Sequence, residues 1–248
     1  IGVQGFGGGL GRLTAAGRLD LWRAADGLAD DRVTDLARDG RGGVWITTLG
    51  GLSHFDGRRF RSFGCADGLP GRHLLCMCRG RDGRLWLGLE GSLAVYDGCA
   101  FQHHWLTDMG AIRDLAEDEE GTIWLATDVG LRCYRPQRYQ PRVRVVRVVA
   151  DRLYEGTAEV RVPATVPQVQ FEYQGLSLRT PAGEMVHRYR LQGHDRGWRA
   201  PTRVRQARYA ALSVGDYTFA VQAVDRDLNY SEPATVRLVV EPDPHLEG

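Results

Sequence analysis

Short alternations of apolar and polar residues, separated by turns rich in glycine, run through the first 140 residues of the chain. Around Trp86, GRLWLGLEG passes from a charged turn into alternating apolar residues, and GGVWITTLG (42–50) and GTIWLATDV (121–129) follow the same pattern. Alternation with a period of two is typical of a β-strand with one buried face, whereas an amphipathic helix has a period of about 3.6. The pattern therefore predicts strands, and its recurrence predicts a repeat.

Three copies of this pattern align over 28 positions without a gap, in segments 33–60, 74–101 and 112–139. The recurring apolar positions are Val33/Leu74/Ile112, Leu36/Met77/Leu115, Leu52/Leu93/Leu131, Phe55/Tyr96/Tyr134 and Phe60/Phe101/Tyr139. Each copy predicts about four short antiparallel strands, and four strands with a period near 40 residues are typical of a β-propeller blade. Helical repeats of similar length have a different apolar spacing and few glycines, so they do not fit this half of the chain.

Trp45, Trp86 and Trp124 stand at the same place in each copy, 41 and 38 residues apart. We expect them to fill the space between adjacent blades, each with its indole N–H bonded to a neighbouring backbone carbonyl. RLDLW at 18–22 matches a fourth strand, so residues 1–140 predict about three and a half four-stranded blades. Because propellers close with about 4–8 blades, we expect the chain to be part of a longer protein.

After Pro141 the repeat ends and a second set of alternating segments begins. Strands are predicted at 143–149, 166–173, 186–193, 205–212, 216–224 and 235–240. About seven short strands over about 100 residues are typical of an immunoglobulin-like sandwich. LSVGDY at 212–217 predicts a tyrosine corner, in which the Tyr217 hydroxyl bonds the backbone upstream. There is no cysteine pair, so the sandwich is closer to fibronectin type III. We expect an all-β chain of two domains, 1–140 and 141–248.

Particular residues connect these two halves to a known family. The residues that carry the resemblance are DGRLWLGLEGSLAVYDG in the repeat, and HRYRLQGHDRGW, RQARYAAL and VGDYTFAVQAVD in the sandwich. The first half resembles the two-component regulator propeller repeats, and the second resembles the Tyr-Tyr-Tyr (Y_Y_Y) domain that follows such propellers in bacterial membrane sensors. Tyr189, Tyr209 and Tyr217 stand where the namesake tyrosines are expected, and Trp198 completes an LxGxDxxW pattern. The resemblance implies structural roles for these four residues.

The resemblance also implies a function. Propeller and sandwich together form the periplasmic sensor of histidine kinases, often hybrid ones, and several relatives sense oligosaccharides. The resemblance implies a small-molecule or oligosaccharide ligand, a homodimer in the parent receptor, and a location on the periplasmic side of a bacterial inner membrane. A transmembrane helix outside this chain would carry the signal. Alternatives are the sensor region of a diguanylate cyclase, a non-signalling glycan-binding adhesion propeller, and a propeller lyase or hydrolase.

Charge and motifs argue against several other functions. The formal net charge is +1, and basic and acidic residues nearly balance in each half, so generic nucleic-acid binding has little electrostatic support. The sequence has no GxSxG, HExxH or phosphate-loop motif, so we expect no catalytic residue, no metal and no cofactor in this chain. We interpret the glycine-rich segment 5–11 as a blade hairpin, the pair His103–His104 as part of a strand, and the acidic run 117–121 as a solvated turn. The alternatives for these segments are a nucleotide site, a metal site and a calcium site.

A ligand-binding face can be placed by topology alone. Since blade strands alternate in direction, the loop after the tryptophan strand and the connection between blades leave the same end of the propeller, where propellers often bind ligands. The candidate ligand-binding residues on these loops are Arg32, Arg72, His73, Glu90, Asp108 and Asp128. Their other interpretation is a solvated rim, and a cleft between the two domains is a further possible site.

Overall fold

The computed structural model describes residues 2–3, 8–106 and 108–242 of the 248-residue chain. The chain divides into two compact units, Ile1–Gln137 and Arg138–Gly248. Nearly all regular structure in both units is strand, because alternating apolar residues recur between glycine turns. The predicted all-β class, a partial propeller followed by a sandwich, is confirmed. Residues 4–7 of the glycine-rich segment and the end of the chain from 243 lie outside the described residues.

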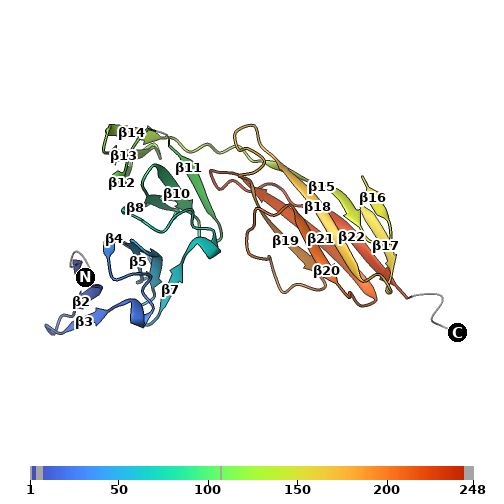
Figure 1. The fold of residues 1–248 in the computed structure, drawn as a ribbon, viewed down its shortest axis with the longest axis horizontal. Helices are drawn as coiled ribbons and strands as arrows, with labels where there is room; N and C mark the ends of the chain where they lie inside the picture. Colours follow the sequence, from blue (N-terminus) through green and yellow to red (C-terminus); the bar gives the residue numbers. More distant parts are fainter. Residues whose placement is uncertain (1, 4–7, 107, 243–248) are drawn as a thin grey trace. The chain divides into compact units, whose positions relative to one another are not determined.

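The first unit is a series of antiparallel sheets that follow one another in chain order, from the blue strands β2 and β3 to the green strands β12–β14 (Figure 1). We call these sheets blades 1 to 4. Blade 1 holds β1 (Gly2–Val3), β2 (Leu10–Leu13) and β3 (Leu19–Trp22). Blade 2 holds β4 (Val33–Arg38), β5 (Val44–Thr48), β6 (Gly51–Phe55) and β7 (Phe60–Phe63). Blade 3 holds β8 (Cys76–Arg79), β9 (Leu85–Gly88), β10 (Ser92–Tyr96) and β11 (Phe101–Trp105), and blade 4 holds β12 (Ile112–Glu117), β13 (Ile123–Thr127) and β14 (Gly130–Tyr134).

The ADGL segments form short 3₁₀ turns that lead from one blade to the next. These turns are η1 (Ala24–Asp26) and η2 (Cys65–Asp67). In η1 the Asp26 carboxylate accepts the Arg23 backbone N–H at 2.8 Å, and Gly27 follows with a φ of 106°, which favours glycine. The leucine that ends each motif, Leu28 or Leu69, is buried. The repeated sequence therefore sets both the turn and its anchor in the core.

Each inner blade presents one face to the next blade and the opposite face to the preceding blade. We call these the outgoing and incoming faces. Aromatic rings on an outgoing face contact an aromatic ring of the third strand in the next blade. The pairs, with ring-centroid distances, are Trp22–Phe55 at 4.8 Å, Trp45–Tyr96 at 5.8 Å, and Trp86–Tyr134 at 6.0 Å. Burial of such side chains contributes about 1.5–3 kcal/mol each, so these contacts hold the blades together.

Two expectations are wrong for the fourth blade, one about the burial of Trp124 and one about a strand around Tyr139. Trp86 is 2% exposed, but Trp124 is 39% exposed and its indole N–H donates to the Asp118 carboxylate at 2.8 Å, not to a backbone carbonyl. The reason is that no blade covers the outgoing face of blade 4 within the described residues. The fourth strand expected around Tyr139 also does not form. Two prolines, Pro136 and Pro141, flank it, and proline cannot donate a ladder hydrogen bond.

The second unit is a sandwich of two four-stranded sheets. One sheet has the order β16-β15-β18-β20, with β15 (Arg142–Val149), β16 (Leu153–Glu155), β18 (Gln168–Leu176) and β20 (Gln206–Ala210). The other has the order β17-β22-β21-β19, with β17 (Glu159–Pro163), β19 (Val186–Gln192), β21 (Gly215–Val224) and β22 (Ala234–Glu241). Strands β17 and β22 pair in parallel, and the other pairs in both sheets are antiparallel. The short strands β16 and β17 come from a segment in which the sequence pattern predicted none.

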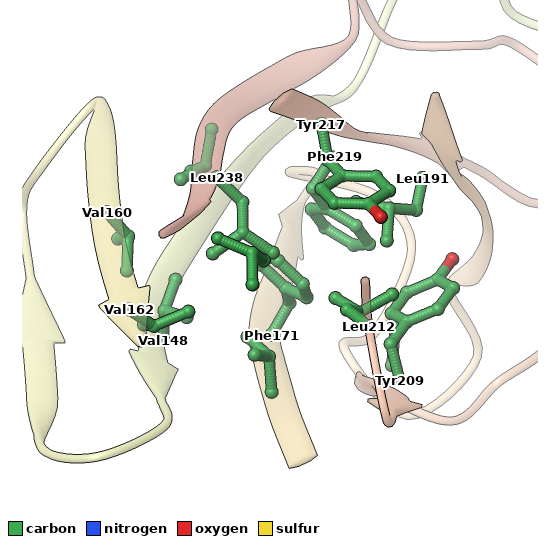
Figure 2. Packing of buried hydrophobic residues seen from close by; sticks show 14 of the residues in the cluster. Val148, Val160, Val162, Phe171, Leu191, Tyr209, Leu212, Tyr217, Phe219 and Leu238 are labelled. Carbon is green, nitrogen blue, oxygen red and sulfur yellow. The ribbon is translucent and has the colours of Figure 1, made fainter. Parts of the chain in front are cut away.

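The sandwich core lies between the two sheets. Figure 2 shows Phe171, Phe219 and Leu238 meeting there, with the Phe171 and Phe219 rings stacked at 4.1 Å between centroids. A tyrosine on the edge of one sheet also ties the sheets together, because the Tyr154 hydroxyl on β16 donates to the Arg161 carbonyl on β17 at 2.9 Å. Alternating apolar residues on both inner faces explain why these segments pack as a two-layer sandwich.

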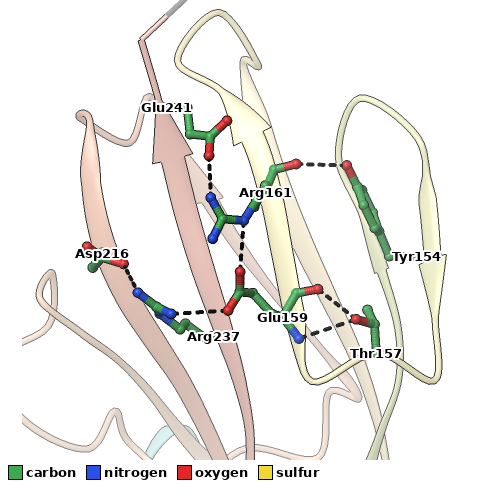
Figure 3. A network of polar contacts seen from close by, with 7 residues as sticks. All are labelled: Tyr154, Thr157, Glu159, Arg161, Asp216, Arg237 and Glu241. Atoms are coloured by element: carbon green, nitrogen blue, oxygen red, sulfur yellow. Dashed lines mark hydrogen bonds and ion pairs between the residues drawn. The ribbon is translucent and has the colours of Figure 1, made fainter.

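Exposed side chains of β17, β21 and β22 form an ion-pair network (Figure 3). Arg161 contacts Glu159 at 2.8 Å and Glu241 at 2.7 Å, and Arg237 contacts Glu159 at 3.1 Å and Asp216 at 2.8 Å. Single exposed pairs contribute at most about 1 kcal/mol, but charges shared between two strands favour one register over a shifted one. The network therefore supports the parallel pairing of β17 with β22.

Candidate functional site

The candidate ligand-binding residues lie in the loops at one end of the blades. In blade 2, the β5–β6 loop and the connection from β7 to β8 leave this end, while the β4–β5 and β6–β7 turns leave the other. Arg32 precedes β4, Arg72 and His73 precede β8, Glu90 follows β9, Asp108 precedes β12, and Asp128 follows β13. Backbone hydrogen bonds fix these loops, for example from Leu49 N–H to the Arg32 carbonyl at 3.1 Å. The end is therefore a rigid platform with charged loops.

One charged cluster lies on the segment that leads from blade 1 into blade 2. The Arg32 guanidinium donates to both carboxylate oxygens of Asp30, at 2.9 and 2.8 Å. These hydrogen bonds lower the pKa of Asp30 to about 2, and His73 on the loop before β8 adds a smaller electrostatic attraction. Asp30 therefore stays ionised at neutral pH, and the cluster presents both hydrogen-bond acceptors and donors.

A second charged cluster lies between blades 3 and 4. The Arg113 guanidinium donates to the Asp128 carboxylate at 2.7 and 3.2 Å, and the Ala111 N–H donates to the same carboxylate at 3.1 Å. The arginine hydrogen bond, first, and the backbone hydrogen bond lower the pKa of Asp128. Glu90 pairs with Ala111 through a β-bridge and contributes an attraction to Arg113. Residues from two blades therefore meet in this cluster.

Two candidates remain outside these clusters. Arg72 is exposed, and its carbonyl accepts the Leu74 N–H at 3.0 Å. Asp108 is exposed and has a φ of 63°, in the left-handed region that aspartate tolerates better than most residues. Sequence reasoning missed Asp30 and Arg113, which complete the clusters. Arg113 has no counterpart in the other copies, where Thr34 and Leu75 occupy its position, so the repeat gave no signal for it.

One of the namesake tyrosines, Tyr209, contacts a buried carboxylate in the sandwich. Asp195 accepts hydrogen bonds from the Tyr209 hydroxyl at 2.6 Å, the Leu191 N–H at 2.8 Å and the Arg199 guanidinium at 2.8 Å. Burial raises the pKa of Asp195, but the hydrogen bonds from Arg199 and Tyr209 outweigh it, so the pKa lies well below its usual range. Asp195 is the aspartate of the LxGxDxxW pattern. Its contacts fasten the loop after β19 to β20.

The other signature residues also have packing roles. The Tyr217 hydroxyl donates to the Ser213 carbonyl at 2.9 Å, which is the geometry of a tyrosine corner. Tyr189 packs against the sandwich core. The Trp198 ring contacts the guanidinium groups of Arg188 and Arg190, at 4.8 and 4.9 Å from its centroid. These cation–π contacts cover the outer face of β19.

The cysteines and histidines give no metal site in the described part of the chain. The five cysteines are free, and burial raises the pKa of Cys76 to about 12, so its thiol is inert. His103 and His104 are both buried in β11. No helix among residues 2–3, 8–106 and 108–242 has the length and apolar character that a membrane span requires.

Fold and loops together define a propeller–sandwich chain with a charged loop face. Residues 27–50 and 68–91 match the family described as Two component regulator propeller, and residues 182–241 match the Y_Y_Y domain family. The chain thus carries two-component regulator propeller repeats followed by a Y_Y_Y domain, and the resemblance drawn from its sequence is confirmed.

Solved structures with some similarity include two extracellular domains from B. thetaiotaomicron. The extracellular domain of the putative hybrid two component system BT3049 is 17% identical, with a TM-score of 0.49, over 96% of this chain and 36% of that chain. That of BT4673 is 18% identical, with a TM-score of 0.40, over 96% and 34%. The fibronectin(III)-like modules of Clostridium thermocellum CbhA are 12% identical, with a TM-score of 0.34, over 66% and 87%. This chain thus spans about a third of the length of the two extracellular domains, and the search of curated proteins gave no match.

Proposed function

We propose that this chain is the ligand-sensing region of a bacterial two-component membrane sensor of the hybrid histidine kinase type. It lies on the periplasmic side of the inner membrane, binds an oligosaccharide, and has no catalytic activity of its own. The observation that carries the proposal is the order of the two family matches, with regulator propeller repeats first and a Y_Y_Y domain second.

The chemistry of the loop face supports a sugar ligand. Sugar hydroxyls both donate and accept hydrogen bonds, and each charged cluster places an ionised carboxylate beside a guanidinium. Both clusters are exposed and are held by rigid sheets, so they are ordered before a ligand binds. Because their arginines keep Asp30 and Asp128 ionised, these carboxylates are poor general acids. Their electrostatics thus favour a binding module over a hydrolase.

Signal transfer would use two chains. A ligand that binds one arrangement of a homodimer better than another shifts the equilibrium between the two arrangements. The sandwich would pass that change to a transmembrane helix outside this chain. The same sensing region in a diguanylate cyclase would work in the same way, whereas an adhesion propeller would bind glycans without an output.

Isothermal titration calorimetry with a panel of neutral and acidic oligosaccharides tests the binding role. We expect Arg32→Ala or Arg113→Ala to weaken binding about 10- to 100-fold, because each removes charge-assisted hydrogen bonds. Arg58→Ala is the matched control, because Arg58 is an exposed arginine on the β6–β7 turn at the opposite end of blade 2. Absence of binding to every sugar, or an equal loss in Arg58→Ala, would contradict the loop-face site.

The signalling role needs a separate test. The coding sequence beyond Gly248 should specify a membrane helix and a histidine kinase. In membrane vesicles, the sugar identified by calorimetry should change autophosphorylation of that kinase. A gene that specifies neither a membrane segment nor a kinase would leave the adhesion propeller as the better interpretation.

A further inference from the structure

The outer face of one sandwich sheet carries more arginines than carboxylates. Phe171 and Tyr173 on β18 belong to the core, so the residues that alternate with them face solvent. The same alternation on β15 and β20 turns four exposed arginines to this outer face, which we call the basic face. Its charged residues are Arg142, Arg144, Arg147, Arg208 and Glu172, with Glu155 beside Arg147 on β16.

The arginines of the ion-pair network on the opposite sheet are neutralised. Arg161 and Arg237 each contact two carboxylates, as Figure 3 shows. On the basic face, Arg147 contacts the Glu172 carboxylate at 2.7 Å. The arginines of this face that form no ion pair within the described residues are Arg142, Arg144 and Arg208. The excess of positive charge therefore belongs to this face and not to the sandwich as a whole.

Glutamines hold two of these arginines in place. Arg144 donates to the side-chain oxygen of Gln174 at 3.2 Å, and the Arg208 Nε–H donates to that of Gln170 at 2.8 Å. Gln170 in turn donates to the Glu172 carboxylate at 2.8 Å. These neutral partners orient the two guanidinium groups without cancelling their charge. Most of the N–H donors of each group stay available for a ligand, so the face is ordered before a ligand binds.

The arginines of the basic face are spread along the direction of the strands. Arg142 pairs with Leu176 on β18, and Arg208 pairs with Gln170 on the same strand. These two positions of β18 are six residues apart, which corresponds to about 20 Å along a strand. The other two arginines lie between these ends. A row of this length fits an extended chain with repeated negative charges better than it fits a single small anion.

We propose that the basic face binds an acidic polysaccharide, a linear chain with a carboxylate on its repeating sugars. Guanidinium groups bind carboxylates through charge-assisted hydrogen bonds, and glutamine amides donate to and accept from sugar hydroxyls. The aromatic rings of β18 and β20 lie in the core, so this face does not offer the stacking platform that single-stranded nucleic acids use. The site is separate from the loop face of the propeller unit and does not depend on the sensor role.

Isothermal titration calorimetry of the 248-residue chain with a hexamer of galacturonic acid tests this site. The methyl ester of the same hexamer is the matched ligand, because it keeps the sugar chain and removes its charge. We expect the acid form to bind with an affinity that falls as salt is added, and the ester to bind at least about 10-fold more weakly. Equal binding of the two forms, or no binding of the acid form, would overturn the proposal.

Substitutions locate the binding on the basic face. Arg144→Gln and Arg208→Gln should each weaken binding of the acid hexamer about 10-fold, because each removes charge-assisted hydrogen bonds. Arg237→Gln is the matched control: it makes the same change of charge on the opposite sheet and should alter the affinity less than about twofold. Arg32→Ala on the propeller loops should also leave this affinity unchanged. An equal loss in Arg237→Gln, or a loss in Arg32→Ala instead, would overturn the site.

Two other polyanions test the class of partner. A thymidylate hexamer and vesicles of phosphatidylglycerol carry negative charge without sugar carboxylates. At the same concentration of charge and of salt, both should bind at least about 10-fold more weakly than the galacturonic acid hexamer, because they lack the paired carboxylate and hydroxyl groups. Tighter binding of the hexamer would support the polysaccharide, whereas equal or tighter binding of the oligonucleotide or the vesicles would overturn it.

Discussion

Replacing Asp195 by Asn tests whether the buried carboxylate holds the sandwich loop together. The side chain is 8% exposed and accepts hydrogen bonds from Leu191, Tyr209 and Arg199. Asparagine keeps the shape but has a single acceptor oxygen. Whichever way the amide points, its NH₂ group faces at least one donor that formerly met a carboxylate oxygen.

The magnitude follows from those contacts. A hydrogen bond to a charged group contributes about 1.5–3 kcal/mol, and a donor left without an acceptor costs about 1–3 kcal/mol. The Arg199 contribution is discounted because its side chain is 44% exposed, where solvent screens the ion pair. We therefore expect Asp195→Asn to lower the free energy of unfolding of the sandwich by about 3 kcal/mol.

Native-state hydrogen exchange followed by mass spectrometry measures this free energy in the sandwich alone. Amides of β19 and β21 should exchange about 100-fold faster in Asp195→Asn, since each 1.4 kcal/mol corresponds to about tenfold. The matched control is Asp216→Asn, which makes the same chemical change at an exposed ion pair and should cost less than about 0.5 kcal/mol. Equal protection in the two variants would refute the role of Asp195.

The pH dependence gives the same carboxylate a second test. The pKa of Asp195 is lower in the folded than in the unfolded chain, so the unfolded chain binds the proton more readily. The stabilisation is therefore fully present above the ordinary pKa of aspartate, near 4, and is lost as pH falls below it. The stability gap between the parent chain and Asp195→Asn should be constant from pH 7 to about 5 and shrink below about 4.

The remaining predictions concern single residues in each unit. Tyr217→Phe should cost about 1–2 kcal/mol, measured by hydrogen exchange, because the Ser213 carbonyl loses its donor while packing is kept. Trp86→Ala should lower the free energy of unfolding of the propeller unit, measured by urea denaturation, by about 3–5 kcal/mol, whereas Trp124→Ala should lower it by less than about 1 kcal/mol. Equal effects would contradict the different burial of the two tryptophans. Burial and, to a smaller extent, the charge of Arg205 lower the pKa of His187 to about 4, so the free energy of unfolding should fall as pH drops from 6.5 toward 4. A His187→Gln chain should lack this pH dependence. An NMR titration that shows a normal histidine pKa would refute the prediction.

Much of the fold follows from the sequence because each blade is one local unit. The period near 40, the alternation and the glycine turns specify a four-stranded sheet from neighbouring residues, so no long-range pairing has to be guessed. The short strands β16 and β17 could not be predicted in this way. The parallel partner of β17 is β22, which lies about 80 residues away in sequence, and its pairing is stabilised by the cross-strand contacts of Arg161 and Arg237.

The candidate site was less predictable than the fold. Topology placed its loops at one end of the blades, but local sequence does not say which side chains will pair there. Asp30 pairs with Arg32 two residues along the same segment, and Arg113 at the start of β12 pairs with Asp128 on the loop after β13. The first contact depends on side-chain conformation within one segment, and the second on how close the start of β12 lies to the loop after β13; the repeat pattern encodes neither.

Both charged clusters lie at the loop end of the blades, where side chains can change without altering the contacts that position the blades. Contacts such as Trp45–Tyr96 and Trp86–Tyr134 fix the spacing of blades 2, 3 and 4. The loop residues above them are exposed, so substitution of Arg32 or Arg113 changes the hydrogen-bonding groups without removing a core contact. A propeller built in this way can change what it binds through its loops while keeping the geometry in which those loops meet.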